Sequence, residues 1–92
     1  MNKRLHLIVK GRVQGVFYRQ FVMSQASELS LKGWVRNLED GNVEIMAEGE
    51  RQKLDKMILK CHEGPSGARV DNLYPEWFPA KGDLSSFTVI HS

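Results

Sequence analysis

The fold of this chain is constrained most by two stretches that have the hydrophobic spacing of an α-helix. Each of them lies between stretches that alternate like a β-strand. Apolar residues recur every three or four positions over residues 19–30 and again over residues 50–62. An amphipathic helix has to cover its apolar face, and a single sheet with both helices on one side does this for both. The pattern predicts an α+β, ferredoxin-like sandwich with the order βαββαβ, an antiparallel sheet and an extra C-terminal strand.

The expected boundaries of these elements follow from breaks in the two periodicities. Gly33 is expected to end the first helix as a left-handed cap, and Gly64 with Pro65 is expected to end the second. Pro75 is expected to end the fourth strand and to begin a loop that runs to Ser85. The pattern leaves the order of the strands across the sheet open. The expected strands cover residues 5–10, 34–38, 43–48, 68–74 and 87–91.

The size and composition of the chain indicate one small globular domain that spans residues 1–92. A chain of 92 residues buries enough surface for a single hydrophobic core. Its 41% hydrophobic and 26% charged residues are an ordinary composition for a soluble protein. No apolar run is long enough to cross a membrane, and the chain enters a strand pattern at once. We therefore expect a cytoplasmic monomer with no membrane association.

Residues 11–19 join the first strand to the first helix with the sequence GRVQGVFYR. Two glycines allow the backbone to turn tightly and to approach a ligand closely. Successive amide groups can then point into one concavity, at the positive end of the following helix. Arg19 adds a planar fork of donors that suits two oxygens of a phosphate or carboxylate, whereas Gln14 is expected only to shape the loop. The loop predicts an anion site, with a phosphoryl group as the expected ligand.

A second motif, GWVRN, follows at residues 33–37. The two motifs, in this order, closely resemble the signature pair of the acylphosphatase family, and the resemblance covers essentially the whole chain. It implies the ferredoxin-like fold and the hydrolysis of acyl phosphates, such as carbamoyl or acetyl phosphate, to a carboxylate and inorganic phosphate. It also implies direct attack by water, with no covalent phosphoenzyme. Residues 87–92 resemble the family only loosely, which leaves their part in the pocket open.

Arg19 and Asn37 are the candidate catalytic residues. A cation in the first turn of a helix is electrostatically misplaced unless an anion binds there, which favours a functional role for Arg19. By resemblance, Arg19 matches the arginine that binds the substrate phosphate. The residue type alone makes Asn37 a turn residue, but the resemblance assigns it to the orientation of the attacking water, which an amide can both donate to and accept from. Five residues are expected to form the phosphate-binding loop: Gly15, Val16, Phe17, Tyr18 and Arg19.

No metal ion or cofactor is expected. His6, His62 and His91 are scattered and lack the spacing of a metal site. Cys61, the only cysteine, falls on the apolar stripe of the second helix, where a thiol acts as a small hydrophobic side chain. An acyl phosphate has a good leaving group, so positioning and charge stabilisation can supply most of the acceleration. The expected ligands are an acyl phosphate substrate and inorganic phosphate, as product or inhibitor.

Two other classes of function remain. One is a noncatalytic module that binds carbamoyl phosphate or another anion, of the kind found inside larger enzymes. The other is an RNA-binding domain, since the same strand order serves in RNA recognition. The expected open face of the first strand carries His6, Ile8 and Lys10 and no aromatic residue for stacking on bases. The net charge of +2 is also weak evidence for such a partner, so we expect no nucleic acid.

Overall fold

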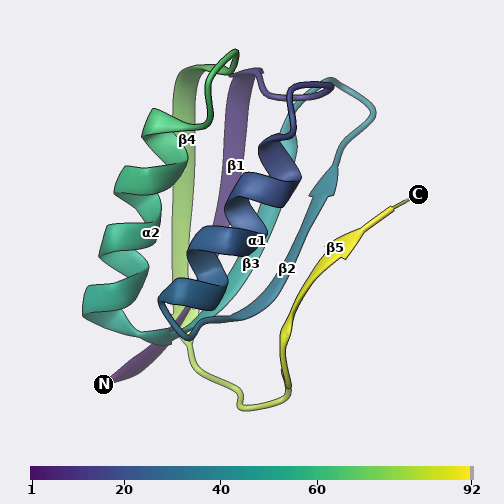
Figure 1. Cartoon of the computed structure of the whole chain (residues 1–92). Helices are drawn as coiled ribbons and strands as arrows, with labels where there is room; N and C mark the ends of the chain where they lie inside the picture. The colour runs from purple at the N-terminus through teal and green to yellow at the C-terminus, as the bar shows by residue number, and fades with distance from the viewer. Residues whose placement is uncertain (92) are drawn as a thin grey trace.

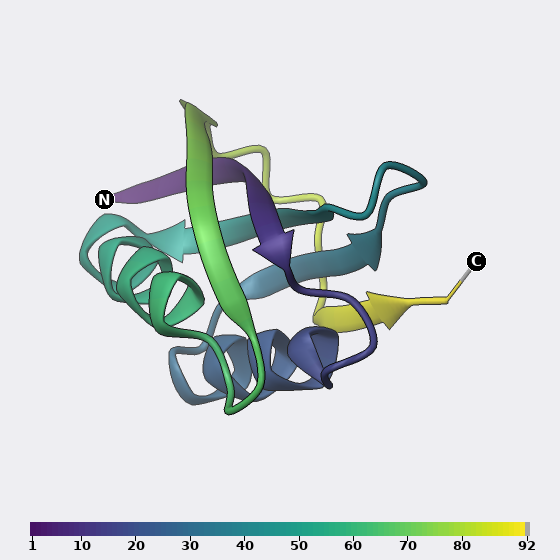
Figure 2. The ribbon, with the colours of Figure 1, turned by 90° about the horizontal axis from the view of Figure 1, so that it is seen from above.

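The computed structural model describes residues 1–91, in which two helices pack against a five-stranded sheet (Figure 1). Seen from above, both helices lie on the same side of the sheet (Figure 2). The order of elements is the predicted one, with a short fifth strand at the end. No helix within residues 1–91 is long and apolar enough to span a membrane. The elements are β1 (Asn2–Arg12), α1 (Tyr18–Glu28), β2 (Lys32–Asn37), β3 (Val43–Glu50), α2 (Arg51–Glu63), β4 (Arg69–Pro79) and β5 (Phe87–Ile90).

The sheet has the strand order β4-β1-β3-β2-β5. β1 pairs antiparallel with β3 and β4, and β2 pairs antiparallel with β3. The fifth strand departs from the predicted antiparallel sheet, because β5 runs parallel to β2. Residues 80–86 carry the chain from the end of β4 to the other edge of the sheet, so that Phe87 pairs with Gly33 near the start of β2 (Figure 1). The sheet is therefore mixed.

The hydrophobic core lies between the sheet and the two helices. Cys61 of α2 is completely buried in it, which confirms its predicted place in the core. Burial raises the pKa of the Cys61 thiol to about 12, so the group stays protonated at neutral pH. Burial of apolar surface, at roughly 25 cal/mol per Å², is the main stabilising contribution in such a layer. The other fully buried side chains from the central strands and helices include Leu5, Leu7, Val9, Val22, Ala26, Val43, Ile45, Ala47, Leu54 and Met57.

The first helix ends differently from the prediction. α1 ends at Glu28, and Ser30 takes the left-handed conformation that was expected of Gly33, with a φ of 56°. The amide of Leu31 then donates to the carbonyl of Ala26 at 2.9 Å, as in a Schellman cap. The prediction for Gly33 was wrong because a serine occupies the position at which glycine is usual.

Gly33 instead lies inside β2, opposite Ala47 of β3. Its φ is 148°, and a Cβ atom on this residue would lie 1.8 Å from the carbonyl oxygen of Met46. The glycine is therefore required by the close approach of two backbones and not by the end of a helix.

β4 is longer than predicted, because it continues through Pro75 as far as Pro79. It pairs only with β1 and so forms an edge of the sheet. Pro75 lies opposite Leu7. A proline has no N–H to donate, and it is tolerated on an edge strand at a position where that group would face solvent. The loop predicted over residues 75–85 is in fact the shorter connection over residues 80–86.

Replacing Gly33 with alanine should destabilise the fold by at least ~3 kcal/mol, because the new Cβ meets backbone atoms that no side-chain rotation can move. Gly41→Ala is the matched control. Gly41 also has a positive φ, of 92°, but a Cβ there would meet nothing within 4 Å, so its cost should be only ~1 kcal/mol. Free energies of unfolding from urea titrations measure both, and equal losses would contradict the steric argument.

Candidate active site

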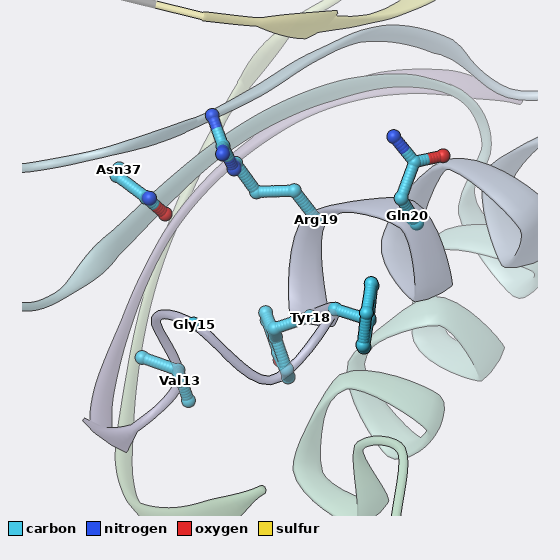
Figure 3. Close-up of a pocket in the computed structure, with 7 residues that line it drawn as sticks. Val13, Gly15, Tyr18, Arg19, Gln20 and Asn37 are labelled. Atoms are coloured by element: carbon cyan, nitrogen blue, oxygen red, sulfur yellow. The ribbon is translucent and has the colours of Figure 1, made fainter.

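A pocket of about 340 Å³ lies at the end of the sheet where β1 and β2 end and α1 begins. β1 and β2 end at the same end of the sheet because each is antiparallel to β3. Arg19 reaches the pocket from α1 and Asn37 from the end of β2 (Figure 3). The structure thus brings the two candidate residues together in a space that suits a small molecule. The lining residues are Val13, Gly15, Phe17, Tyr18, Arg19, Gln20 and Asn37.

The first turn of α1 has none of the usual capping groups. Phe17 precedes the helix as its N-cap residue, and no side chain among residues 1–91 caps the first amides. The first turn also contains no acidic residue. Its amide groups and the helix dipole therefore present a positive potential at the pocket. A helix end of this kind binds phosphate or carboxylate groups readily.

Two residues of the loop before α1 have positive φ angles, Gly15 at 74° and Phe17 at 61°. Left-handed residues in a loop turn successive amide groups toward one side and form an anion-binding concavity. Glycine adopts this conformation easily, whereas a residue such as phenylalanine does so at a cost of about 1–3 kcal/mol. Phe17 is 83% exposed, so burial of its ring does not offset that cost. Local strain of this kind is common at ligand-binding sites.

Arg19 is partly buried, and its position is fixed by the last strand of the sheet. The Nη1 group donates a hydrogen bond of 3.0 Å to the carbonyl oxygen of Ile90 at the end of β5. No carboxylate among residues 1–91 forms an ion pair with Arg19. A guanidinium has five N–H donors, so the bond to Ile90 leaves others for an anion. The C-terminal strand, whose role the sequence left open, thus orients the arginine.

The side-chain oxygen of Asn37 has no hydrogen-bond partner in the described part of the chain. This atom, Oδ1, is buried. The turn that follows does not use it, because Asp40 accepts bonds from the amide and side chain of Asn42, at 3.0 and 3.1 Å. The amide of Leu38 also donates to the carbonyl of Asn42, at 2.9 Å. A buried acceptor left unpaired costs about 1–3 kcal/mol, which favours a ligand role for Asn37 over a turn role.

Tyr18 anchors the loop through its buried side chain, whose hydroxyl group bonds to α2. The ring is buried, and its hydroxyl donates a hydrogen bond of 2.7 Å to the carbonyl oxygen of Cys61 in α2. Burial raises the pKa of Tyr18 far above its ordinary value, so the hydroxyl remains a donor at neutral pH. The bond ties the end of the loop and the start of α1 to the second helix.

The pocket offers groups that bind and orient an anion. Its polar side chains are the guanidinium of Arg19 and the amides of Gln20 and Asn37, beside the loop backbone. Residues 1–91 contain no group of three or more His, Cys, Asp or Glu side chains placed to hold a metal ion. His6 lies outside the pocket, with its Nε2 atom 2.7 Å from a carboxylate oxygen of Glu44. No side chain of the pocket is an evident nucleophile.

Known proteins match this chain over almost its whole length. The family model for acylphosphatase matches residues 5–89, and an acylphosphatase from Marinobacter nauticus is 49% identical over 88 residues, or 96% of each chain. The chain belongs to the acylphosphatase family. The crystal structure of the acylphosphatase from Bacillus subtilis has a TM-score of 0.94 at 32% identity, and covers 97% of this chain and 99% of its own. An acylphosphatase from Coxiella burnetii has a TM-score of 0.91 at 42% identity, over 97% and 93%.

Membership of the acylphosphatase family confirms the resemblance drawn from the two motifs, and the solved acylphosphatases confirm the ferredoxin-like fold. This chain and its curated acylphosphatase relatives cover one another almost completely. The two alternatives, an anion-binding module of a larger enzyme and an RNA-binding domain, are therefore not favoured.

The pocket predicts that inorganic phosphate binds here and stabilises the fold, by about 2.7 kcal/mol at a hundred times its Kd. Arg19→Ala should weaken this binding about 10- to 100-fold, because it removes charge-assisted hydrogen bonds. Lys10→Ala is the control, since it removes the same charge from an exposed position outside the pocket. Thermal unfolding across a phosphate titration measures both. Equal phosphate affinity in the two variants would show that Arg19 is not a ligand.

Proposed function

We propose that this chain hydrolyses acyl phosphates, the mixed anhydrides of a carboxylic acid and phosphoric acid, by direct attack of water on phosphorus. Its family and its relatives along the whole chain support the reaction. One observation carries the mechanism. A single pocket contains Arg19, the start of α1 and the buried oxygen of Asn37, and within residues 1–91 neither the helix start has a side-chain cap nor the oxygen a partner.

The phosphoryl group of the substrate binds at the loop. The amide groups of residues 15–19 and the guanidinium of Arg19 hold its oxygens by charge-assisted hydrogen bonds. These donors are preorganised, because the carbonyl of Ile90 already holds the guanidinium and the backbone of the loop is fixed at the helix end. Fixed donors of this kind stabilise developing charge with little rearrangement during the reaction.

Asn37 places the attacking water. Its Oδ1 atom accepts a hydrogen bond from the water, which turns a lone pair of the water toward phosphorus. The new bond from water oxygen to phosphorus forms as the bond from phosphorus to the acyl oxygen breaks, and the electron pair leaves with the carboxylate. The proton of the water passes to an oxygen of the transferred phosphoryl group. The products are a carboxylate and inorganic phosphate, and positioning with charge stabilisation supplies most of the acceleration.

The same proposal assigns the reaction to a cytoplasmic monomer that needs no metal ion or cofactor. Cys61 is a free, buried thiol, and the sequence has no second cysteine with which it could form an internal disulfide bond.

Nucleic acid is not a proposed partner. On the face of the sheet that the helices leave open, the central strand β3 carries Glu44 and Glu48, opposite Ile8 and Arg4 of β1. Both carboxylates have lowered pKa values: burial alone would raise them, but hydrogen bonds from His6 and Arg36 to Glu44, and from Arg4 to Glu48, outweigh it. Because Arg36 is paired with Glu44 and Arg4 with Glu48, these arginines are not free to bind a phosphate backbone.

Replacing Asn37 with alanine should lower kcat by roughly 10²–10³-fold while the Kd for phosphate changes little, because the water is held mainly in the transition state. Asn37→Asp should also fail, since a carboxylate beside the phosphate adds repulsion and lacks the amide donor. Steady-state hydrolysis of acetyl phosphate and phosphate titrations of folded variants measure both quantities. A wild-type kcat in Asn37→Ala, or a large loss of phosphate affinity, would make the asparagine a structural residue.

Hydrolysis should survive exhaustive chelation, because residues 1–91 offer no cluster of metal ligands and the proposed charge stabilisation comes from Arg19 and backbone amides. The measurement is kcat on acetyl phosphate before and after dialysis against a chelator, with elemental analysis of the dialysed protein. Activity that disappears on dialysis and returns with Mg²⁺ or Zn²⁺ would refute the mechanism.

A further inference from the structure

Gln14 joins the phosphate loop to the turn that follows Asn37. It lies in the loop between β1 and α1, and its Nε2 group donates two hydrogen bonds, to the carbonyl oxygens of Leu38 at 2.8 Å and Asn42 at 2.7 Å. These two carbonyls lie on opposite sides of the turn between β2 and β3. One amide group therefore uses both of its protons to hold the two sides of the turn.

The turn does not need Gln14 to close. The carbonyl of Asn42 already accepts a hydrogen bond from the amide of Leu38 at 2.9 Å, and the carbonyl of Leu38 accepts one from the amide of Gly41 at 3.2 Å. Asp40 holds the turn from its other side through two bonds to Asn42. A carbonyl oxygen has two lone pairs, so Gln14 uses the second acceptor site of each. Its bonds add a connection between two segments that are each already formed.

We infer that Gln14 is a positioning residue that fixes the separation between the bound phosphoryl group and the attacking water, an inference that rests on the proposed function. Gln14 directly precedes Gly15, the first residue of the phosphate-binding backbone, and Leu38 directly follows Asn37. The bond between Gln14 and Leu38 thus links the two halves of the site one residue away from each. In-line attack requires reacting atoms about 3–3.5 Å apart, and a displacement near 1 Å can cost about 100-fold in rate.

Gln14→Met tests this role, because methionine has similar length and no donor. The carbonyls of Leu38 and Asn42 keep their backbone partners, so the fold should survive. The loop amides and Arg19 belong to one segment and keep their arrangement, so the Kd for inorganic phosphate should stay near the wild-type value. The water on Asn37 loses its alignment, and kcat on acetyl phosphate should fall by roughly 10- to 100-fold.

Gln14→Glu adds a readout that a purely structural role would not give. A protonated carboxyl can donate one of the two lost hydrogen bonds, whereas a carboxylate can donate none and faces two carbonyl oxygens. The carbonyls should raise the pKa of the introduced carboxyl above its ordinary value of about 4.3. Relative to wild type at each pH, kcat of Gln14→Glu should be highest at low pH and fall as the carboxyl ionises. The relative kcat of Gln14→Met should not change with pH.

A double variant shows whether Gln14 acts through Asn37. If it does, adding Gln14→Met to Asn37→Ala should lower kcat little further, because the water is already lost. Fully additive losses, a wild-type kcat in Gln14→Met, or a relative kcat of Gln14→Glu that is flat with pH would each overturn the inference. If Gln14→Met does not fold, the pH profile of Gln14→Glu still decides. A wild-type kcat in Asn37→Ala alone would instead refute the proposed water site, which separates the two failures.

Discussion

Burial of the apolar face of β1 and β3 beneath the two helices is the interaction on which the rest of this structure depends. It places the two strands at the centre of the sheet, with β2 on one side and β4 on the other. Because β1 and β2 are both antiparallel to β3, and β5 is parallel to β2, the C-terminal ends of these three strands lie at the same end of the sheet. α1 starts at that end because it follows β1 after a short loop (Figure 1). The pairing of the strands thus brings together the segments that line the pocket, which are the loop after β1, the end of β2 and the start of α1.

The same end of the sheet contains three local arrangements that lower the stability of the fold. Phe17 has a left-handed backbone, α1 begins without a capping side chain, and Asn37 has a buried oxygen with no partner within residues 1–91. Two departures also occur outside the pocket, because α2 begins without a capping side-chain bond from Glu50 and Ser30 has a left-handed backbone. Each departure in the pocket is worth of order 1 kcal/mol or more, and an anion with an ordered water would offset all three. What distinguishes the pocket is that three departures occur together there, which is typical of a functional site.

The sequence predicts most of the fold because hydrophobic periodicity records which face of each element is buried. It predicts Arg19 because a cation at the start of a helix violates a local rule, but it separates Asn37 from a turn residue only through the family motif. It misplaces Gly33 and Pro75 because their roles depend on strands distant in sequence, the carbonyl of β3 in one case and the free edge of the sheet in the other. The two bonds of Gln14 are hidden for a similar reason, since both acceptors are backbone carbonyls, which every residue has.

The parallel strand β5 shows how an addition to the sheet affects the chemistry of the pocket. Its last carbonyl, at Ile90, holds the guanidinium of Arg19, so the aim of the arginine depends on where β5 lies. β5 is short and has only β2 as a neighbour in the sheet, and the connection over residues 80–86 has to bring it there. Glu48 anchors that connection by accepting two of its backbone amides, at 3.1 and 2.8 Å, while it is paired with Arg4 at 2.7 Å. Loss of Arg4 or Glu48 would leave the other charge buried without its partner, which is strongly destabilising. Loss of Glu48 would also remove two bonds to the connection that positions β5. A residue at one end of the sheet thus helps to position Arg19 at the other end.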